Sequence, residues 1–232
     1  MKDPEIDRVL EDAARAPHSV SPAVLDHIAT SIHSSLHPVR PVPRTWVLTA
    51  GLLVLSAAVA LGGAARSGLF GFWTQSVGER VIILSILAVL AGVVARELVS
   101  YWIPGRRHYL APGWLVVLVS AALLSVFGSL FDDYHTSRFV PTGVICLSVG
   151  VLHAVFAACL AAWFLRRGLA VEPVSAGTIA GTFGGLSGVA MLELHCPNLE
   201  APHVLFWHVA VVPVSAALGA LVARAIITRK RG

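Results

Sequence analysis

Long apolar runs separated by short polar stretches set the pattern of this chain. A helix needs about 20 mostly apolar residues to cross a bilayer, and each of the six longest runs has about that length or more. Such runs, carrying almost no charge, are typical of transmembrane helices. They cover residues 46–63, 81–103, 114–131, 140–165, 174–192 and 203–225. The pattern therefore predicts an all-α fold, built as a six-helix transmembrane bundle.

The residues before the first run follow an amphipathic pattern instead. Residues 3–15 place apolar side chains at helical spacing, with acidic residues on the other face. A second helix is predicted after Ser21, which suits an N-cap, with Pro22 at the first helical position. The apolar stripes of the two helices comprise Ile6, Val9 and Leu10, then Leu25, Ile28, Ile32 and Leu36. Because short helices are marginal in water alone, we expect these stripes to pack on another surface.

Composition supports a membrane protein and argues against a nucleic-acid-binding one. Charged residues make up 13% of the chain, hydrophobic residues 56%, and the mean hydropathy is +0.77. A soluble domain carries about 25% charged residues. The net charge of +4 fits basic loops on one membrane face, since no soluble basic stripe with interleaved aromatic residues is present. We therefore expect the lipid bilayer as a partner, and no direct contact with nucleic acid.

The basic residues predict how the bundle is oriented. With the N-terminus in the cytoplasm, only Arg66, Arg80 and Arg138 fall outside and Arg96 lies within a span, which leaves 13 of the 17 Lys and Arg residues inside. Basic residues collect on the cytoplasmic side of membrane proteins. We therefore predict that both termini are cytoplasmic. The chain then divides into a cytoplasmic N-terminal segment, residues 1–44, and a six-span domain, residues 45–232.

In this topology, cysteine and histidine residues gather at the outer face. Both side chains are ligands of zinc and copper, and ionisable groups in a membrane are functional candidates. The spacing matches no standard zinc motif, and His203 and His208 are five residues apart, which separates them on an ideal α-helix. The alternatives are a hydrogen-bonded corner that caps helix ends and a metal or redox site. The candidate ligands for zinc or copper are His195, Cys196, His203 and His208.

The cysteines allow a second chemistry. Cys146 and Cys196 both lie on the predicted outer, oxidising side. A disulfide between them requires Cα atoms within about 7 Å, which only a structure can show. Cys159 lies deeper in its span and is more typical of a small packing residue.

Two further patterns narrow the functional class. Gly177, Gly181 and Gly185 have the small-xxx-small spacing that lets helices approach closely, and packing within the bundle is favoured over dimerisation. Adjacent Arg96 and Glu97 must point in different directions on a helix. No Ser/His/Asp arrangement, phosphate-binding loop or pair of carboxylates at catalytic spacing is present, so we do not expect an enzyme.

Several short motifs together resemble a known family. Residues 36–43 read LHPVRPVP, residues 104–106 read PGR, and residues 194–198 read LHCPN, followed by APH at 201–203 and WH at 207–208. With six spans and a short soluble N-terminus, these motifs resemble the NrsF family of bacterial membrane anti-sigma factors. The His-Cys-Pro segment with the downstream Trp-His is the most specific part of this resemblance.

The resemblance implies a function that cannot be derived from composition and residue spacing. Members of the family bind an extracytoplasmic-function (ECF) sigma factor through the cytoplasmic N-terminal segment. They hold it at the inner membrane until a signal is sensed. Two periplasmic cysteines are linked to that sensing, and the matching positions here are Cys146 and Cys196. Whether a metal or an oxidant is the signal stays open, as do the particular sigma factor and the oligomeric state.

The acidic N-terminal segment fits such a partner better than a membrane surface, because anionic headgroups attract basic helices. An alternative function is a small membrane transporter or metal-binding membrane protein. A transporter needs a polar path through the bundle, and the first, third and sixth apolar runs contain almost no ionisable residues.

Overall fold

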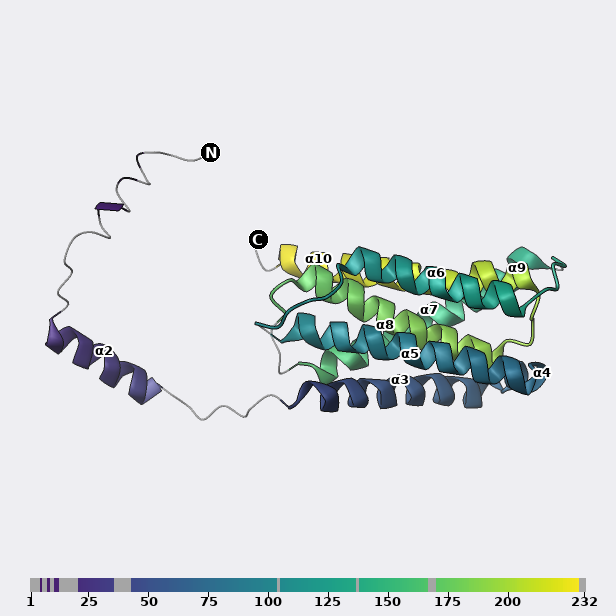
Figure 1. Cartoon of the computed structure of the whole chain (residues 1–232), viewed down its shortest axis with the longest axis horizontal. Coiled ribbons are helices and arrows are strands. Elements are labelled where there is room, and N and C mark those ends of the chain that lie inside the picture. Colours follow the sequence, from purple (N-terminus) through teal and green to yellow (C-terminus); the bar gives the residue numbers. More distant parts are fainter. Residues whose placement is uncertain are drawn as a thin grey trace. The chain divides into compact units, whose positions relative to one another are not determined.

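The computed structural model describes residues 5, 8, 11, 12, 21–35, 43–103, 105–136, 138–166 and 170–229. The chain divides into two compact units, residues 1–41 and residues 42–232. The boundary between them lies close to the end of the predicted N-terminal segment. Helix labels below are those of Figure 1.

The first unit contains α2 (Pro22–Ser35). The helix begins as predicted, because the backbone N–H groups of Val24 and Leu25 donate to the carbonyl of Ser21. Its apolar stripe is open: Leu25 is 55%, Ile28 47% and Ile32 52% exposed. The end of the predicted stripe, Leu36, lies outside the described residues. So do Ile6, Val9 and Leu10 of the first predicted helix, of which the structure describes Glu5, Arg8, Glu11 and Asp12, all helical.

The second unit is a helical bundle, and six of its helices are long and apolar enough to cross a membrane. They run side by side along one axis (Figure 1). The spans are α3 (Thr45–Ser67), α5 (Val77–Trp102), α6 (Pro112–Leu130), α7 (Phe139–Phe164), α8 (Pro173–His195) and a composite last span, Ala201–Arg229. The described residues contain no strand. The predicted fold class is therefore confirmed, and each end of the observed helices lies within four residues of the predicted end.

Helix α8 lies at the centre of this bundle. In its most apolar stretch 72% of the residues are buried, against 22–39% in the other spans. Its glycines allow this close packing: a Cβ on Gly184 would strike the Ala154 carbonyl of α7, and one on Gly181 would strike the Ser215 carbonyl of the last span. The glycine pattern therefore serves packing inside the bundle.

The short helix α4 (Phe70–Thr74) closes one end of the bundle, against the end of α8. A Cβ on Gly71 would come 2.6 Å from the carbonyl oxygens of Glu193 and Cys196, so only glycine allows this approach. Helix α5 then begins with a capping box, in which Ser76 and Glu79 bond each other's backbone N–H. This arrangement fixes α4 beside the residues that follow α8.

Candidate functional site

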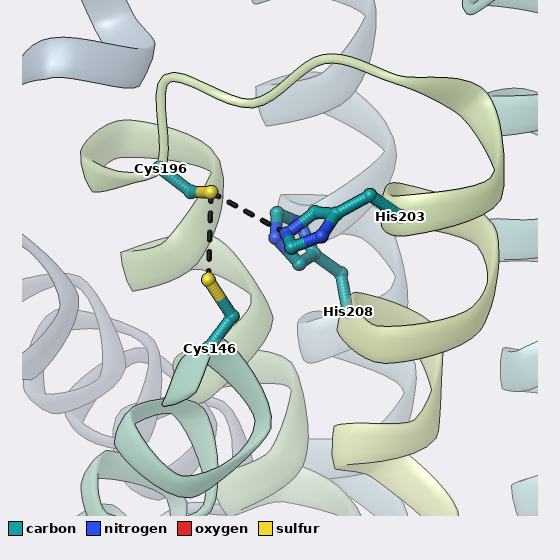
Figure 2. Close-up of side chains that lie close together, drawn as sticks. All are labelled: Cys146, Cys196, His203 and His208. Carbon is teal, nitrogen blue, oxygen red and sulfur yellow. Dashed lines mark hydrogen bonds between the residues drawn. The ribbon is translucent and has the colours of Figure 1, made fainter. Parts of the chain in front are cut away.

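Four side chains from three parts of the bundle meet at the end that holds α4 and α9 (Figure 2). Cys146 comes from α7, Cys196 follows α8, and His203 and His208 belong to the last span. The two sulfur atoms are 3.5 Å apart, and Cys196 Sγ lies 3.6 Å from His203 Nε2. One donor atom from each residue falls within 4.8 Å of all the others. These four residues are called the Cys/His cluster below.

The Cys/His cluster is buried, and two of its nitrogen atoms have no hydrogen-bond partner among the residues that the structure describes. His203 is 0% and His208 1% exposed, Cys196 is buried, and Cys146 is half-buried. His203 Nδ1 and His208 Nε2 are both buried and unpaired. A buried polar atom without a partner costs about 1–3 kcal/mol, so the unpaired Nε2 of His208 points to a ligand. Both cysteines are free thiols.

The two histidines come together because the last span begins with a π-helical turn. The span consists of α9 (Ala201–His203), the π-helix η1 (Val204–His208) and α10 (Val209–Arg229). The Val209 N–H donates to the carbonyl of Val204, five residues earlier, which brings residues five apart onto one side. The imidazole rings of His203 and His208 lie with centroids 5.2 Å apart. The expectation that this spacing separates them was wrong, since it assumed an α-helix.

Proline explains part of this local geometry. Pro213 lies inside α10, four residues after Val209, and it has no N–H to bond the Val209 carbonyl. The regular hydrogen-bond ladder is therefore interrupted directly after the π-turn. Proline and π-bulges are both known causes of local distortion in helices.

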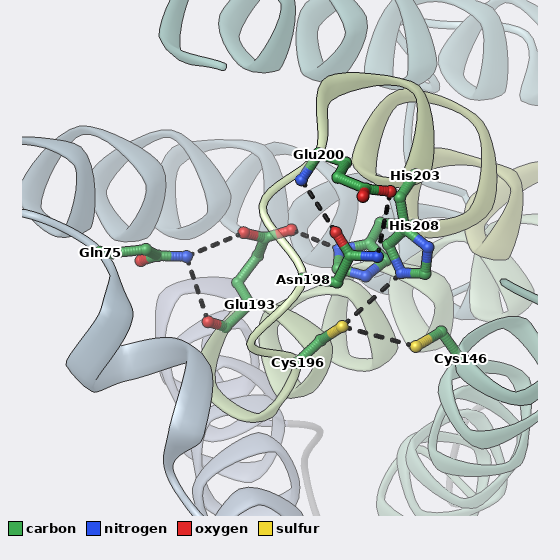
Figure 3. A network of polar contacts seen from close by, with 8 residues as sticks. All are labelled: Gln75, Cys146, Glu193, Cys196, Asn198, Glu200, His203 and His208. Carbon is green, nitrogen blue, oxygen red and sulfur yellow. Dashed lines mark hydrogen bonds and ion pairs between the residues drawn. The ribbon is translucent and has the colours of Figure 1, made fainter. Parts of the chain in front are cut away.

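A buried carboxylate orients one of the histidines (Figure 3). His208 Nδ1 donates to Glu193 Oε1 at 2.7 Å, and Glu193 is only 2% exposed. Gln75, just after α4, donates from Nε2 to Glu193 Oε2 and to the Glu193 carbonyl, each at 3.2 Å. With its Nδ1–H donated to the carboxylate, His208 keeps the Nε2 lone pair for a ligand, as carboxylate-bound histidines do at metal sites.

The loop between α8 and α9 is held over the Cys/His cluster by its own polar contacts. Asn198 Oδ1 accepts from the Glu200 N–H at 2.9 Å, and Asn198 Nδ2 lies 3.4 Å from Glu200 Oε2 (Figure 3). The Ala201 N–H donates to the Asp133 carbonyl at 2.6 Å, which ties this loop to the loop after α6. The contacts give Cys196 and His203 fixed positions.

The structure places the other sequence-predicted candidate elsewhere. His195 donates from Nδ1 to the Gly68 carbonyl at 2.8 Å, near the start of α4, and is not one of the four clustered residues. Cys146 takes the fourth position instead. Sequence reasoning did not select Gln75 or Glu193 as site residues. The available signal was Glu193 itself, an ionisable residue at the end of an apolar run.

The local environment keeps the Cys196 thiol neutral in the absence of a ligand. Its hydrogen bond with Cys146, followed by burial, raises the pKa of Cys196 above the usual value for a thiol. A thiol must lose its proton to bind a metal. Ligand binding at this position therefore releases a proton that the folded protein otherwise holds.

The donor set fits a soft or borderline metal ion. Two thiols and two imidazoles match the Cys₂His₂ set of zinc sites, and the same ligands suit copper(I). Zinc bonds of about 2.0–2.3 Å in a tetrahedron place the donor atoms about 3.3–3.8 Å apart. The separations of 3.5 Å and 3.6 Å within the Cys/His cluster fall in this range. Cys146, Cys196, His203 and His208 would hold the ion.

The fold and site define a helical membrane protein with a buried thiol–imidazole cluster at one end of its bundle. Residues 33–228 match the family model NrsF, negative regulator of sigma F. The chain therefore belongs to the NrsF family, and its function is the negative regulation of a sigma factor. The comparison with curated proteins and the comparison with solved structures gave no match.

Proposed function

We propose that this protein is a membrane-bound anti-sigma factor that sequesters an ECF sigma factor through residues 1–44. The sigma factor is released when the Cys/His cluster binds a metal ion or is oxidised on the periplasmic side. Membership in a family of sigma-factor regulators supports the partner class. The role proposed for the binding segment rests on the exposed apolar stripe of α2, which comprises Leu25, Ile28 and Ile32.

The apolar face of α2 is of the kind that docks into a groove of a partner protein. Leu25, Ile28 and Ile32 are about half exposed and lie on one face of α2. Amphipathic helices of this kind bind by inserting such a face into an apolar groove of a partner. Full burial of each Leu or Ile side chain is worth about 1.5–3 kcal/mol, so covering the stripe supplies a large part of a stable complex. We propose no enzymatic activity for the protein.

The proposed orientation puts binding and sensing on opposite faces of the inner membrane. Arg106 and Arg107 lie in the loop between α5 and α6, at the end of the bundle opposite α9 (Figure 1). Because basic loops stay in the cytoplasm, that end is cytoplasmic in our proposal and both termini lie there. The Cys/His cluster then faces the periplasm, where metal ions and oxidants arrive from outside the cell.

A route for the signal runs through α8. The Cys/His cluster joins α7, the end of α8 and the last span, so a bound ion pulls on all three. Further along α8, the hydroxyl of Ser187 forms a buried hydrogen bond with that of Ser56 in α3. Helix α3 follows directly after the N-terminal segment. We propose that rearrangement at the Cys/His cluster shifts α8 against α3 and thereby changes the segment that holds the sigma factor.

Oxidation is a second candidate signal, because the Cys146 and Cys196 sulfurs are already in contact at 3.5 Å. A disulfide bond is about 2.05 Å long, so a small movement is enough to form one. A peroxide would supply the oxidant: the two thiols give up two protons and two electrons, and the O–O bond is cleaved to water and an alcohol or a second water. Metal binding protects the same sulfurs, so the two signals compete for one site.

The test of sigma-factor binding uses the full chain, co-expressed with each candidate ECF sigma factor of its own organism. We expect one of these factors to co-purify with it in detergent and Leu25→Glu to abolish capture. Thr30→Glu adds the same charge to the same exposed helix, away from the stripe, and is the matched control. Equal capture by the wild type and Leu25→Glu would overturn the role of α2, and no capture by the wild type would overturn sequestration itself.

A further inference from the structure

An open pocket of about 700 Å³ lies between the start of α3, the end of α5 and the loop before α6. In Figure 1, the start of α3 and the end of α5 lie at the end of the bundle opposite α9. Three arginines line the pocket, together with aromatic and hydroxyl side chains. The residues that matter here are Arg96, Arg106, Arg107, Trp46, Thr49 and Tyr109.

In the described part of the chain, the arginines of this pocket, Arg96, Arg106 and Arg107, lack a carboxylate ion-pair partner. The neighbouring Glu97 is buried and accepts the Tyr109 N–H at 3.3 Å. Arg96 lies over the Tyr109 ring, 5.0 Å from its centroid. Three guanidinium groups in one cavity repel each other unless an anion joins them.

The depth of Arg96 also calls for an anionic partner. It lies six residues before the end of α5, at Trp102, which is about 9 Å along a helix axis. A charged side chain within a span is costly and is usually paired. Its long stem lets the guanidinium reach towards the headgroup region, where Arg106 and Arg107 of the loop also lie.

The rest of the pocket lining is largely apolar, as expected of a site that binds a lipid. Trp46, 66% exposed, and Leu53 line its wall along α3, and aromatic residues are enriched where membrane and water meet. The cavity thus joins a basic rim to an apolar wall that continues towards the bilayer. A free inorganic anion would use only the rim, whereas a phospholipid would use both parts.

We propose that this pocket binds an anionic phospholipid, with its phosphate held by Arg96, Arg106 and Arg107. Guanidinium groups bind phosphate oxygens with paired, charge-assisted hydrogen bonds. The acyl chain lies along the α3 wall beside Leu53. This lipid site is independent of the Cys/His cluster and of sigma-factor binding, and it fixes the start of α3 against the end of α5.

The test is a lipid titration of the purified full chain in a neutral detergent, followed by native mass spectrometry. We expect phosphatidylglycerol to be retained at lower concentrations than phosphatidylcholine. Arg96→Gln, and separately Arg106→Gln with Arg107→Gln, should weaken retention of phosphatidylglycerol by about fivefold for each charge removed. The double change lies in a loop, so it remains informative if Arg96→Gln fails to fold.

Arg166→Gln is the matched control. Arg166 follows α7 at the same end of the bundle and stacks on Trp163, 4.7 Å from its centroid, outside the pocket. Its loss should leave retention unchanged. Equal retention of the two lipids, or equal weakening by Arg166→Gln, would overturn the proposal. Displacement of the lipid by millimolar inorganic phosphate would assign the site to free phosphate instead.

Discussion

The two ends of the transmembrane bundle hold their polar side chains in opposite ways. At the α9 end, Glu193, His203 and His208 are at most 2% exposed and are joined in one network. At the other end, Arg106 and Arg107 are exposed and have no carboxylate partner among the described residues. The polar side chains are buried and hydrogen-bonded at one end, and they are exposed at the other.

This difference predicts at which end of the bundle substitutions have large effects. In a buried network, each removed partner leaves another group unsatisfied, and the low dielectric makes that expensive. At an exposed end, water replaces a lost partner. Basic side chains there interact mainly with the headgroups of anionic lipids. We therefore expect large, specific effects at the Cys/His cluster and smaller, graded effects at exposed sites.

The largest expected effect is the loss of metal binding when a ligand of the Cys/His cluster is removed. Cys196→Ser should weaken zinc binding to the purified full chain by more than about hundredfold, because even residues behind the ligands are worth 10- to 100-fold. Competition with a chelator of known affinity measures the change. Cys146→Ser should act in the same direction.

The control for this substitution lies on the same helix as one of the ligands. Cys159→Ser removes an exposed thiol from α7, away from the cluster, and should leave zinc affinity unchanged. If all three variants bind zinc as the wild type does, the Cys/His cluster is not the metal site. If the transcriptional response also survives Cys146→Ser with Cys196→Ser, no cysteine chemistry underlies sensing.

A smaller effect is expected from the carboxylate behind His208. Glu193→Gln keeps the shape of the side chain but removes the charge that orients the imidazole through its 2.7 Å bond. Zinc affinity should fall by about 10- to 100-fold, while the number of ions bound stays at one. Rescue by Glu193→Asp would not be expected, since the shorter side chain cannot span the same distance. Unchanged affinity in Glu193→Gln would reduce Glu193 to a packing role.

Much of the fold follows from the sequence pattern because the bilayer imposes a strong rule. Backbone groups in hydrocarbon must bond each other, so each long apolar run becomes one helix. All six observed spans lie over the predicted runs. The start of α2 was also predicted correctly, because its signals, Ser21 and Pro22, act within one helical turn.

The Cys/His cluster could be predicted only in part from the sequence. Sequence motifs drew attention to Cys196, His203 and His208, but their grouping with Cys146 depends on how α7 packs beside α8. The π-turn of η1 hid the relation of the two histidines, since it adds a residue to the helical repeat. Gln75 contributes through a contact with Glu193, 118 residues away in the chain, which no local pattern reveals.

The smallest expected effect concerns an ion pair exposed to water in the loop between α6 and α7. His135 Nδ1 contacts Asp133 Oδ1, and both side chains are largely exposed. The hydrogen bond to Asp133 raises the pKa of His135, and the hydrogen bonds from His135 lower the pKa of Asp133. The histidine contribution to stability is complete below its unfolded pKa of about 6.5 and is lost as the pH rises through the folded value. The aspartate contribution is lost as the pH falls through its lowered pKa.

The pair therefore stabilises the fold between these limits, with the upper limit above pH 6.5 set by His135. Unfolding temperatures of the full chain in detergent, measured from pH 5 to pH 9, should differ little between the wild type and Asp133→Asn, and the difference should vanish at high pH. Salt should reduce it further, because exposed charges are screened. A difference as large as that of a buried-cluster variant, or one that grows above pH 8, would mean that this loop is coupled to the Cys/His cluster through the Ala201 contact to Asp133.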